Sequence, residues 1–246
     1  MTTQIVEIIG RSTQGVTQPF ICRGTDDAIY FVKGFGAGKR SLVCEWVAGN
    51  LALRLGLPIA PFEIVDVPDM LIQLGSRSDL RELGAGLAFG SRKLFLSEFN
   101  LSNLVQIPIA VQRDVLAFDL WIRNADRTQT LRGGNPNLFV DQEKNALVMI
   151  DHNQAFEFEF DFDFNTFTQS HVFHRQLSAL QGDWVEQEGY RDKFMKALAS
   201  WPEICNTLPD AWRFIDVEQT LPLELTAEKM LQTLLRCQNE NFWRMT

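Results

Sequence analysis

The sequence predicts a mixed α+β fold, with a β-rich first part and a mainly helical remainder. The runs QIVEII (4–9) and AIYFVKGF (28–35) are rich in the β-branched and aromatic residues typical of strands. From residue 101 onward, apolar residues recur at intervals of three and four, which indicates helices. With 46% hydrophobic and 22% charged residues among 246, the chain has an ordinary globular composition. We therefore expect two folded parts, residues 1–100 and 101–246.

The first part is predicted to be a small sheet with one helix. The segment RSTQGVTQP (11–19) separates the first two strands and has the composition of a turn, which suggests a hairpin-like pair. Residues 41–55 carry an apolar stripe with helical spacing, and Gly56 and Pro58 end it. Three further strands are expected at 61–67, 69–75 and 93–100.

The second part begins with a predicted helix whose apolar face runs from Val111 to Ile122. Two short apolar strands, NLFV (137–140) and ALVMI (146–150), follow it. In EFEFDFDFNTF (157–167), Phe alternates with acidic residues, and we favour an edge strand or a loop over a binding site. Further helices are expected near 171–181, 189–200, 208–217 and 226–244.

Charge and cysteine content limit the partners and the compartment. The formal net charge of −8 argues against a nucleic-acid surface, which needs Lys and Arg to neutralise phosphates. The four cysteines form no CxxC motif, and no secretory leader precedes them, so we expect reduced thiols in the cytoplasm. No apolar run approaches the length of a membrane span.

Two local motifs suggest ligand sites that we do not favour. GFGAGKRS (34–41) resembles a phosphate-binding loop, but Lys33 and Arg40 stand where that motif needs Gly and Ser or Thr. HVFH (171–174) places two histidines three residues apart, but no third ligand with zinc-like spacing is visible. We interpret the histidines as a surface pair.

A more informative pattern is distributed along the chain. Lys33 lies in an apolar predicted strand, where its ammonium needs an anionic partner, and Glu45 on the following helix can supply one. Taken alone, this pair is equally consistent with a structural ion pair. Phosphoryl transfer, however, needs a lysine on the phosphates, together with a phosphate cradle, an acid near the acceptor hydroxyl and oxygen ligands for Mg²⁺.

Candidates for all of these roles occur in the order found in kinases. They are Gly15 in the loop STQGVTQP (12–19) for the cradle, Lys33 for the phosphates, Asp126 for the acid, and Asn137 and Asp151 for Mg²⁺.

The predicted strands support the placement of the last two residues. Asn137 begins one short strand and Asp151 follows the other, so a hairpin would bring both oxygen-bearing side chains to one end. Asp126 follows a helix and precedes a turn-rich segment, where a carboxylate can face a cleft. In the alternative interpretation, Asn135, Asp126 and Asp151 only cap turns and a strand end.

Several segments together resemble the HipA-like kinases, bacterial relatives of the protein-kinase and phosphatidylinositol-kinase fold. These segments are IYFVKGF, CEWVAGNLALRLGLPIAP, LFLSEFN, AFDLWIRNADR, NPNLFV and VMIDHNQAF. The resemblance covers about residues 10–156, and the remainder is similar only in being helical. It implies a bilobal protein-kinase-like fold, with a small β-rich N-lobe carrying one helix (1–100) and a larger, mainly helical C-lobe (101–246).

The resemblance also implies a role for each matching residue. Lys33 would be the ATP-phosphate lysine with Glu45 as its helix partner, and Asp126 would be the catalytic aspartate. Asn137 and Asp151 would bind Mg²⁺, and the backbone of Leu96, Ser97 and Glu98 would meet adenine as the hinge. The implied activity is ATP- and Mg²⁺-dependent phosphorylation of Ser or Thr on a protein substrate.

The catalytic segment departs from the better-known members of that family. Those members have a His two residues after the catalytic Asp, where this chain has Thr128, and TQTLRGG lengthens the interval before Asn137. Asn135 therefore competes with Asn137 for the metal role, and the pattern resembles a shorter-chain subgroup. Two alternative functions follow: a nucleotide-binding pseudokinase that acts as an interaction module, and a kinase for small molecules or lipids.

Overall fold

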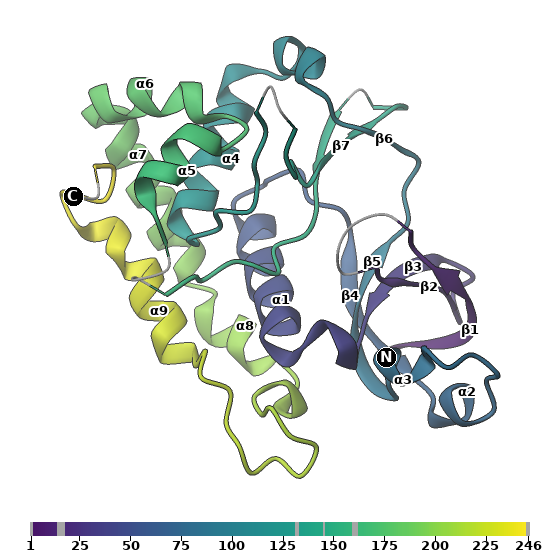
Figure 1. Ribbon diagram of the computed structural model, residues 1–246. Coiled ribbons are helices and arrows are strands. Elements are labelled where there is room, and N and C mark those ends of the chain that lie inside the picture. The colour runs from purple at the N-terminus through teal and green to yellow at the C-terminus, as the bar shows by residue number, and fades with distance from the viewer. Residues whose placement is uncertain (1, 14–17, 131–132, 145, 159–161, 245–246) are drawn as a thin grey trace. The chain divides into compact units, whose positions relative to one another are not determined.

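The computed structural model describes residues 2–13, 18–130, 133–144, 146–158 and 162–244 of a mixed α+β protein (Figure 1). The residues form two compact units. The first comprises Met1–Trp46, Ala60–Phe95 and Leu208–Glu224, and the second comprises Val47–Ile59, Leu96–Thr207 and Leu225–Thr246.

Five strands of the first unit close into a barrel in the order β1-β2-β3-β5-β4. Their bounds are Thr3–Arg11 (β1), Phe20–Gly24 (β2), Ile29–Lys33 (β3), Phe62–Val67 (β4) and Gly86–Arg92 (β5). Neighbouring strands are antiparallel except β1 and β4, whose short parallel pairing closes the barrel. Alternate residues face inward, and the barrel core includes Ile5, Cys22, Tyr30, Val32 and Val65.

The predicted strands of this unit are confirmed in part. Those at 4–9, 28–35 and 61–67 are present, whereas the strand predicted at 69–75 is wrong. Asp69–Gln73 is a short helix (α2), entered from Pro68, with Asp69 in its first turn. The sequence did not predict β2 and β5. Gly86 and Gly90 weaken the strand signal of β5, and Gly90 is needed because a Cβ there would lie 2.8 Å from Val65 Cγ1.

The helix predicted at 41–55 is confirmed as α1, Lys39–Arg54. It follows a short 3₁₀ turn, η1 (Phe35–Ala37), that packs against α3 (Leu80–Leu83). This packing explains two glycines of the GFGAGK segment, because a Cβ on Gly34 would lie 1.9 Å from the carbonyl oxygen of Leu83 and one on Gly36 would lie 2.9 Å from Glu82 Cβ. Gly38 instead has a φ of 79°, which favours glycine.

The second unit contains a three-stranded antiparallel sheet in the order β6-β7-β8. Its strands are Leu96–Glu98 (β6), Leu138–Asp141 (β7) and Ala146–Met149 (β8). The strand predicted at 93–100 therefore pairs with β7 in this sheet. The helices are Ile109–Trp121 (α4), Phe164–Ser170 (α5), Leu177–Gly182 (α6), Trp184–Leu198 (α7), Trp201–Asn206 (α8) and Ala227–Leu235 (α9), with 3₁₀ segments Leu101–Gln106 (η2), His174–Gln176 (η3) and Arg236–Gln238 (η5).

Two predictions for the later part of the chain need comment. The helix predicted at 208–217 is wrong: only a 3₁₀ turn, η4 (Asp210–Trp212), forms there in the first unit, where the buried Trp212 indole donates to Leu87 O at 3.0 Å. In the acidic segment, the described residues form a loop that leads to α5, which Asp163 caps. Among the residues described here, no helix is long and apolar enough to span a bilayer.

Candidate active site

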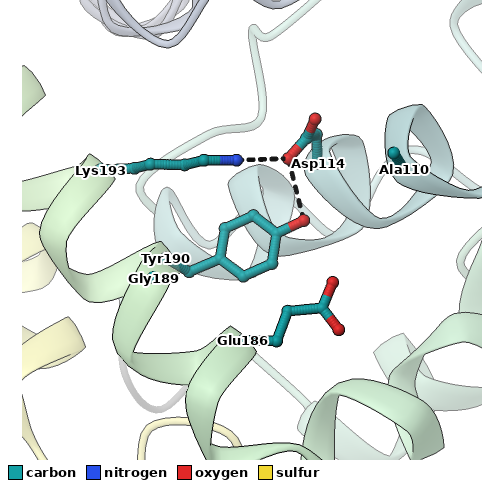
Figure 2. Close-up of a pocket in the computed structure, with 6 residues that line it drawn as sticks. All are labelled: Ala110, Asp114, Glu186, Gly189, Tyr190 and Lys193. Atoms are coloured by element: carbon teal, nitrogen blue, oxygen red, sulfur yellow. Dashed lines mark hydrogen bonds and ion pairs between the residues drawn. The ribbon is translucent and has the colours of Figure 1, made fainter.

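A pocket of about 190 Å³ lies between α4 and α7 in the second unit (Figure 2). One lining carboxylate, Asp114, accepts hydrogen bonds from the Tyr190 hydroxyl at 2.9 Å and from Lys193 Nζ at 3.2 Å. The other, Glu186, pairs with Arg113 at 2.9 Å. The pocket is lined by none of the residues predicted from the sequence, and its two carboxylates are already paired.

Lys33 and Glu45 form a buried ion pair in the first unit. Lys33 is the last residue of β3 and lies on the opposite strand face from Val32, which points into the barrel core. Its Nζ lies 2.5 Å from Glu45 Oε1 on α1, and the two side chains are 9% and 3% exposed. The ion pair expected from the sequence is therefore present.

Of the predicted phosphate cradle and hinge, the hinge lies within the described residues. Gly15 lies outside the described residues. Leu96, Ser97 and Glu98 form β6, which is an edge strand of the three-stranded sheet and pairs with β7 on one side. An edge strand presents backbone N–H and C=O groups, which is the chemistry that a hinge needs to bind a purine base.

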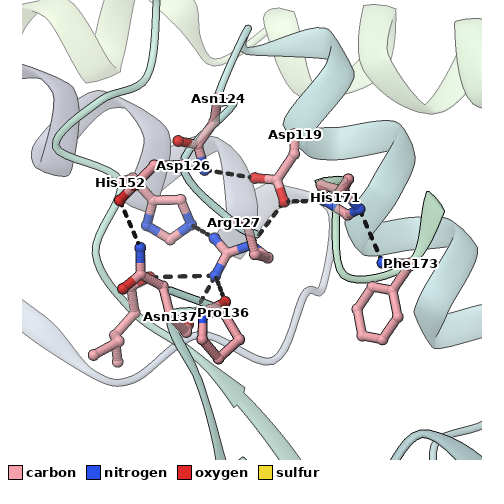
Figure 3. A network of polar contacts seen from close by, with 10 residues as sticks. Asp119, Asn124, Asp126, Arg127, Pro136, Asn137, His152, His171 and Phe173 are labelled. Atoms are coloured by element: carbon pink, nitrogen blue, oxygen red, sulfur yellow. Dashed lines mark hydrogen bonds and ion pairs between the residues drawn. The ribbon is translucent and has the colours of Figure 1, made fainter. Parts of the chain in front are cut away.

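Asp126 lies in the loop after α4, with two amides on one of its oxygens. Asn135 Nδ2 and Asn137 Nδ2 each donate to Asp126 Oδ2 at 3.0 Å, and Figure 3 shows the second of these bonds. Within the described part of the chain, Oδ1 accepts no hydrogen bond. Burial, reinforced by the negative charge of Asp151, raises the pKa of Asp126, and the Asn137 hydrogen bond opposes this rise. Asp126 thus offers one fixed oxygen and one that can receive a proton.

Asn137 and Asp151 lie at the same end of the β7–β8 hairpin. Leu138 pairs with Met149, and the ladder continues with the Ile150 N–H donating to Asn137 O at 3.1 Å. Both residues have left-handed backbone angles, with φ of 48° at Asn137 and 55° at Asp151, which Asn and Asp tolerate better than most residues.

These residues fit a magnesium ion. Asn137 donates to Asp126 through its amide nitrogen, so its side-chain oxygen remains to face a cation, and the charge of Asp151 acts on the same Asp126 carboxylate. Mg²⁺ prefers such oxygen donors and usually takes one or two carboxylates plus phosphates and water. The described residues contain no group of three or more His, Cys, Asp or Glu side chains that could hold a metal.

A buried polar network next to these residues was not predicted. Arg127 Nε donates to Asp119 Oδ2 at 2.7 Å, and both side chains are fully buried (Figure 3). His171 Nε2 lies 3.0 Å from the same oxygen, and Asn124 Nδ2 donates to Oδ1 at 2.8 Å. Burial acts to raise the pKa of Asp119, but the charge of Arg127 and the His171 hydrogen bond outweigh it and hold that pKa well below its usual range.

The interpretation of His171 as a surface residue is wrong, because its side chain is buried in this network. Its Nδ1 accepts a hydrogen bond from the Phe173 N–H at 3.1 Å, so Nε2 carries the proton that is donated to Asp119. The available signal was Asp119, a carboxylate inside the apolar run AFDLW, which required a buried partner. Nothing in the local sequence identified Arg127 as that partner.

The match to a protein-family model agrees with the resemblance seen in the sequence. The family model described as HipA-like kinase matches residues 5–246. A crystal structure of the proinflammatory kinase CtkA from Helicobacter pylori is similar over 96% of this chain and 92% of that chain, with 12% identity and a TM-score of 0.43. No curated protein matches the sequence significantly. Because the family model covers nearly the whole chain, the protein belongs to the HipA-like kinase family and is a phosphotransferase of the kinase type.

Proposed function

We propose that this protein transfers the γ-phosphoryl group of ATP, in the presence of Mg²⁺, to a Ser or Thr hydroxyl of a cytoplasmic protein. The observation that carries the proposal is the convergence of Asp126, Asn137 and Asp151 at one end of the β7–β8 hairpin. Asp126 would accept the proton, and Asn137 and Asp151 would supply oxygen ligands for Mg²⁺. Phosphoryl transfer requires both kinds of group.

The proposal keeps the bilobal arrangement, with residues 1–100 as N-lobe and 101–246 as C-lobe. It assigns Lys33, held by Glu45, to the α- and β-phosphates of the same ATP molecule. Gly15 would contribute to the loop over the phosphates, and the backbone of Leu96–Glu98 would bind adenine.

In the transfer step, Asp126 orients the acceptor hydroxyl and receives its proton on Oδ1. The two amides on Oδ2 hold the carboxylate in one rotamer, so Oδ1 is presented in a constant direction. The acceptor oxygen forms a bond to the γ-phosphorus, the bond from that phosphorus to the bridging oxygen breaks, and ADP leaves. Bound Mg²⁺ would offset negative charge on the β- and γ-phosphates.

The test is phosphate transfer from labelled ATP, measured on the protein itself and on a panel of protein, lipid and small-molecule acceptors. Asp126→Ala should abolish transfer because the proton acceptor is removed, and it should retain ATP binding, which the proposal assigns mainly to Lys33 and the backbone of Leu96–Glu98. Asp183→Ala is the matched control, since it removes an exposed carboxylate that caps α7. Undiminished transfer by Asp126→Ala would reject the catalytic role.

The acceptor panel also separates the two alternatives. ATP binding without transfer to any acceptor would identify a pseudokinase. Transfer confined to a lipid or a small molecule would replace the protein substrate in the proposal while keeping the site.

A further inference from the structure

A single buried guanidinium contacts the backbone on both sides of Asn137. Arg127 Nη1 donates to Asn137 O at 2.7 Å and lies 3.3 Å from Pro136 O. These carbonyls belong to the peptide groups that follow and precede Asn137. Arg127 therefore fixes both peptide planes that orient this side chain.

The same guanidinium also reaches both sides of Asp151. Nη1 lies 3.4 Å from Ile150 O, in the peptide group before Asp151, and Nη2 lies 3.1 Å from Nε2 of His152, the next residue (Figure 3). Because Arg only donates hydrogen bonds, His152 Nε2 must accept, and its ring proton is on Nδ1. Arg127 thus brackets both candidate metal ligands.

The contacts of Arg127 on both sides of each residue matter because Asn137 and Asp151 both have positive φ angles. Non-glycine residues keep such angles only where surrounding contacts determine the backbone. The guanidinium is itself fixed, since Asp119 holds Nε and is in turn held by His171 and Asn124. The chain from α4 to the ligand backbone is therefore rigid and buried.

We propose that Arg127 is a positioning residue that sets the spacing and orientation of Asn137 and Asp151 as Mg²⁺ ligands. This inference rests on the metal role assigned to those two residues in the proposed function. Arg127 is fully buried and in this role acts through the backbone. A planar fork with several donors can bracket both ligands, whereas the point charge of a lysine cannot.

The test is direct metal binding, measured by electron paramagnetic resonance of Mn²⁺ with a nonhydrolysable ATP analogue. Arg127→Lys keeps the charge opposite Asp119 but loses the fork, and it should weaken Mn²⁺ binding about 10–100-fold, the usual effect of removing a group that orients metal ligands. Binding of the analogue without metal should stay close to that of the wild type. A melting curve by circular dichroism establishes that the variant is folded.

Trp121→Phe is the matched control for loss of a buried hydrogen bond in the same unit. Its indole donates to Leu234 O at 2.8 Å and stacks on Phe194 with a centroid separation of 4.3 Å, so Mn²⁺ binding should be unchanged. If folded Arg127→Lys binds Mn²⁺ like the wild type, or if Trp121→Phe weakens binding equally, the positioning role is rejected.

A second pair of variants keeps the test decisive if Arg127→Lys does not fold. His152→Gln retains an acceptor for Arg127, whereas His152→Leu removes it, so only the Leu variant should lose Mn²⁺ affinity. Equal Mn²⁺ binding by the two variants would overturn the inference.

Failure of this inference can be distinguished from failure of the proposed function. If the wild type binds Mn²⁺ and nucleotide but transfers no phosphate, the kinase proposal fails and the Arg127 variants still decide the positioning role. If the wild type binds no Mn²⁺ with the nucleotide, the positioning role is overturned.

Discussion

Two buried ion pairs, one in each unit, differ in what they hold. Lys33 and Glu45 join a strand to a helix through an ammonium, which is a compact point charge. Asp119 and Arg127 join α4 to a loop through a planar guanidinium that also binds backbone carbonyls. The first pair presents a charge, and the second organises the geometry of a loop.

The difference matters because buried ion pairs are weak sources of stability. Desolvation of both charges offsets most of their attraction, so well-packed apolar residues often serve a fold as well. We therefore infer that each pair has a functional role. Lys33 would bind phosphate, and Arg127 would position Asn137 and Asp151. The predictions that follow separate these roles.

The largest expected effect is on folding in the second unit. Asp119→Ala leaves the Arg127 guanidinium buried without its carboxylate and should lower the free energy of unfolding by about 3–5 kcal/mol. Urea denaturation measures this loss. Asp183→Ala, which removes an exposed helix cap, should cost only about 1 kcal/mol. Equal losses of unfolding free energy in the two variants would show that the buried network adds nothing to stability.

Substitution of Lys33 should affect catalysis. Lys33→Met removes the charge that we assign to the ATP phosphates and should lower kcat/KM for ATP by about 10²–10³-fold, the range found when one stabilising donor is lost. Steady-state kinetics measures this change.

The matched control is Lys39→Met, at the start of α1 in the GFGAGK segment. It should leave kcat/KM within about twofold, since we assign that segment to backbone packing. If kcat/KM fell strongly in Lys39→Met and not in Lys33→Met, the GFGAGK segment would be the phosphate-binding element instead of Lys33.

A smaller effect is expected in the pH dependence of stability. Burial lowers the pKa of His171 below the ordinary histidine pKa of about 6.5, so the unfolded chain binds more protons as the pH falls below that value. Stability should therefore be fully present above about pH 6.5 and decline below it, by at most about 1.4 kcal/mol per pH unit. His171→Gln should flatten this decline in denaturation midpoints. An unchanged slope would mean that His171 does not remain neutral in the folded state.

The smallest effect concerns Asn135, which donates one of the two hydrogen bonds to Asp126 Oδ2. Its amide lowers the pKa of Asp126 against the larger effect of burial, so Asn135→Ala should move the acid limb of kcat/KM to slightly higher pH. The Mg²⁺ requirement should not change. A clear rise in that requirement would make Asn135, instead of Asn137, the metal ligand.

The sequence predicted one ion pair and one hairpin that depend on local pattern. Lys33 lies in an apolar strand and Glu45 on the next helix, and two short strands bring Asn137 and Asp151 together. The buried network was beyond prediction, because Arg127 gathers partners from Asp119 to His152 that only tertiary folding brings into contact.

The fold shows the same division. Strands with clear apolar runs were predicted, whereas β5 escaped prediction because two glycines interrupt its pattern. The segment 69–75 has strand-like composition but forms α2, since Pro68 and Asp69 begin a helical turn there. Tertiary packing decided the structure of β5, and a local helix-start signal decided that of α2.

The most direct measurement is a crystal structure of the protein with Mg²⁺ and a nonhydrolysable ATP analogue. We predict Mg²⁺ bound by Asn137 Oδ1 and an Asp151 carboxylate oxygen at about 2.0–2.1 Å, with Lys33 Nζ on the phosphates of the same nucleotide. A nucleotide bound away from Lys33, or a metal held without Asn137 and Asp151, would contradict the account.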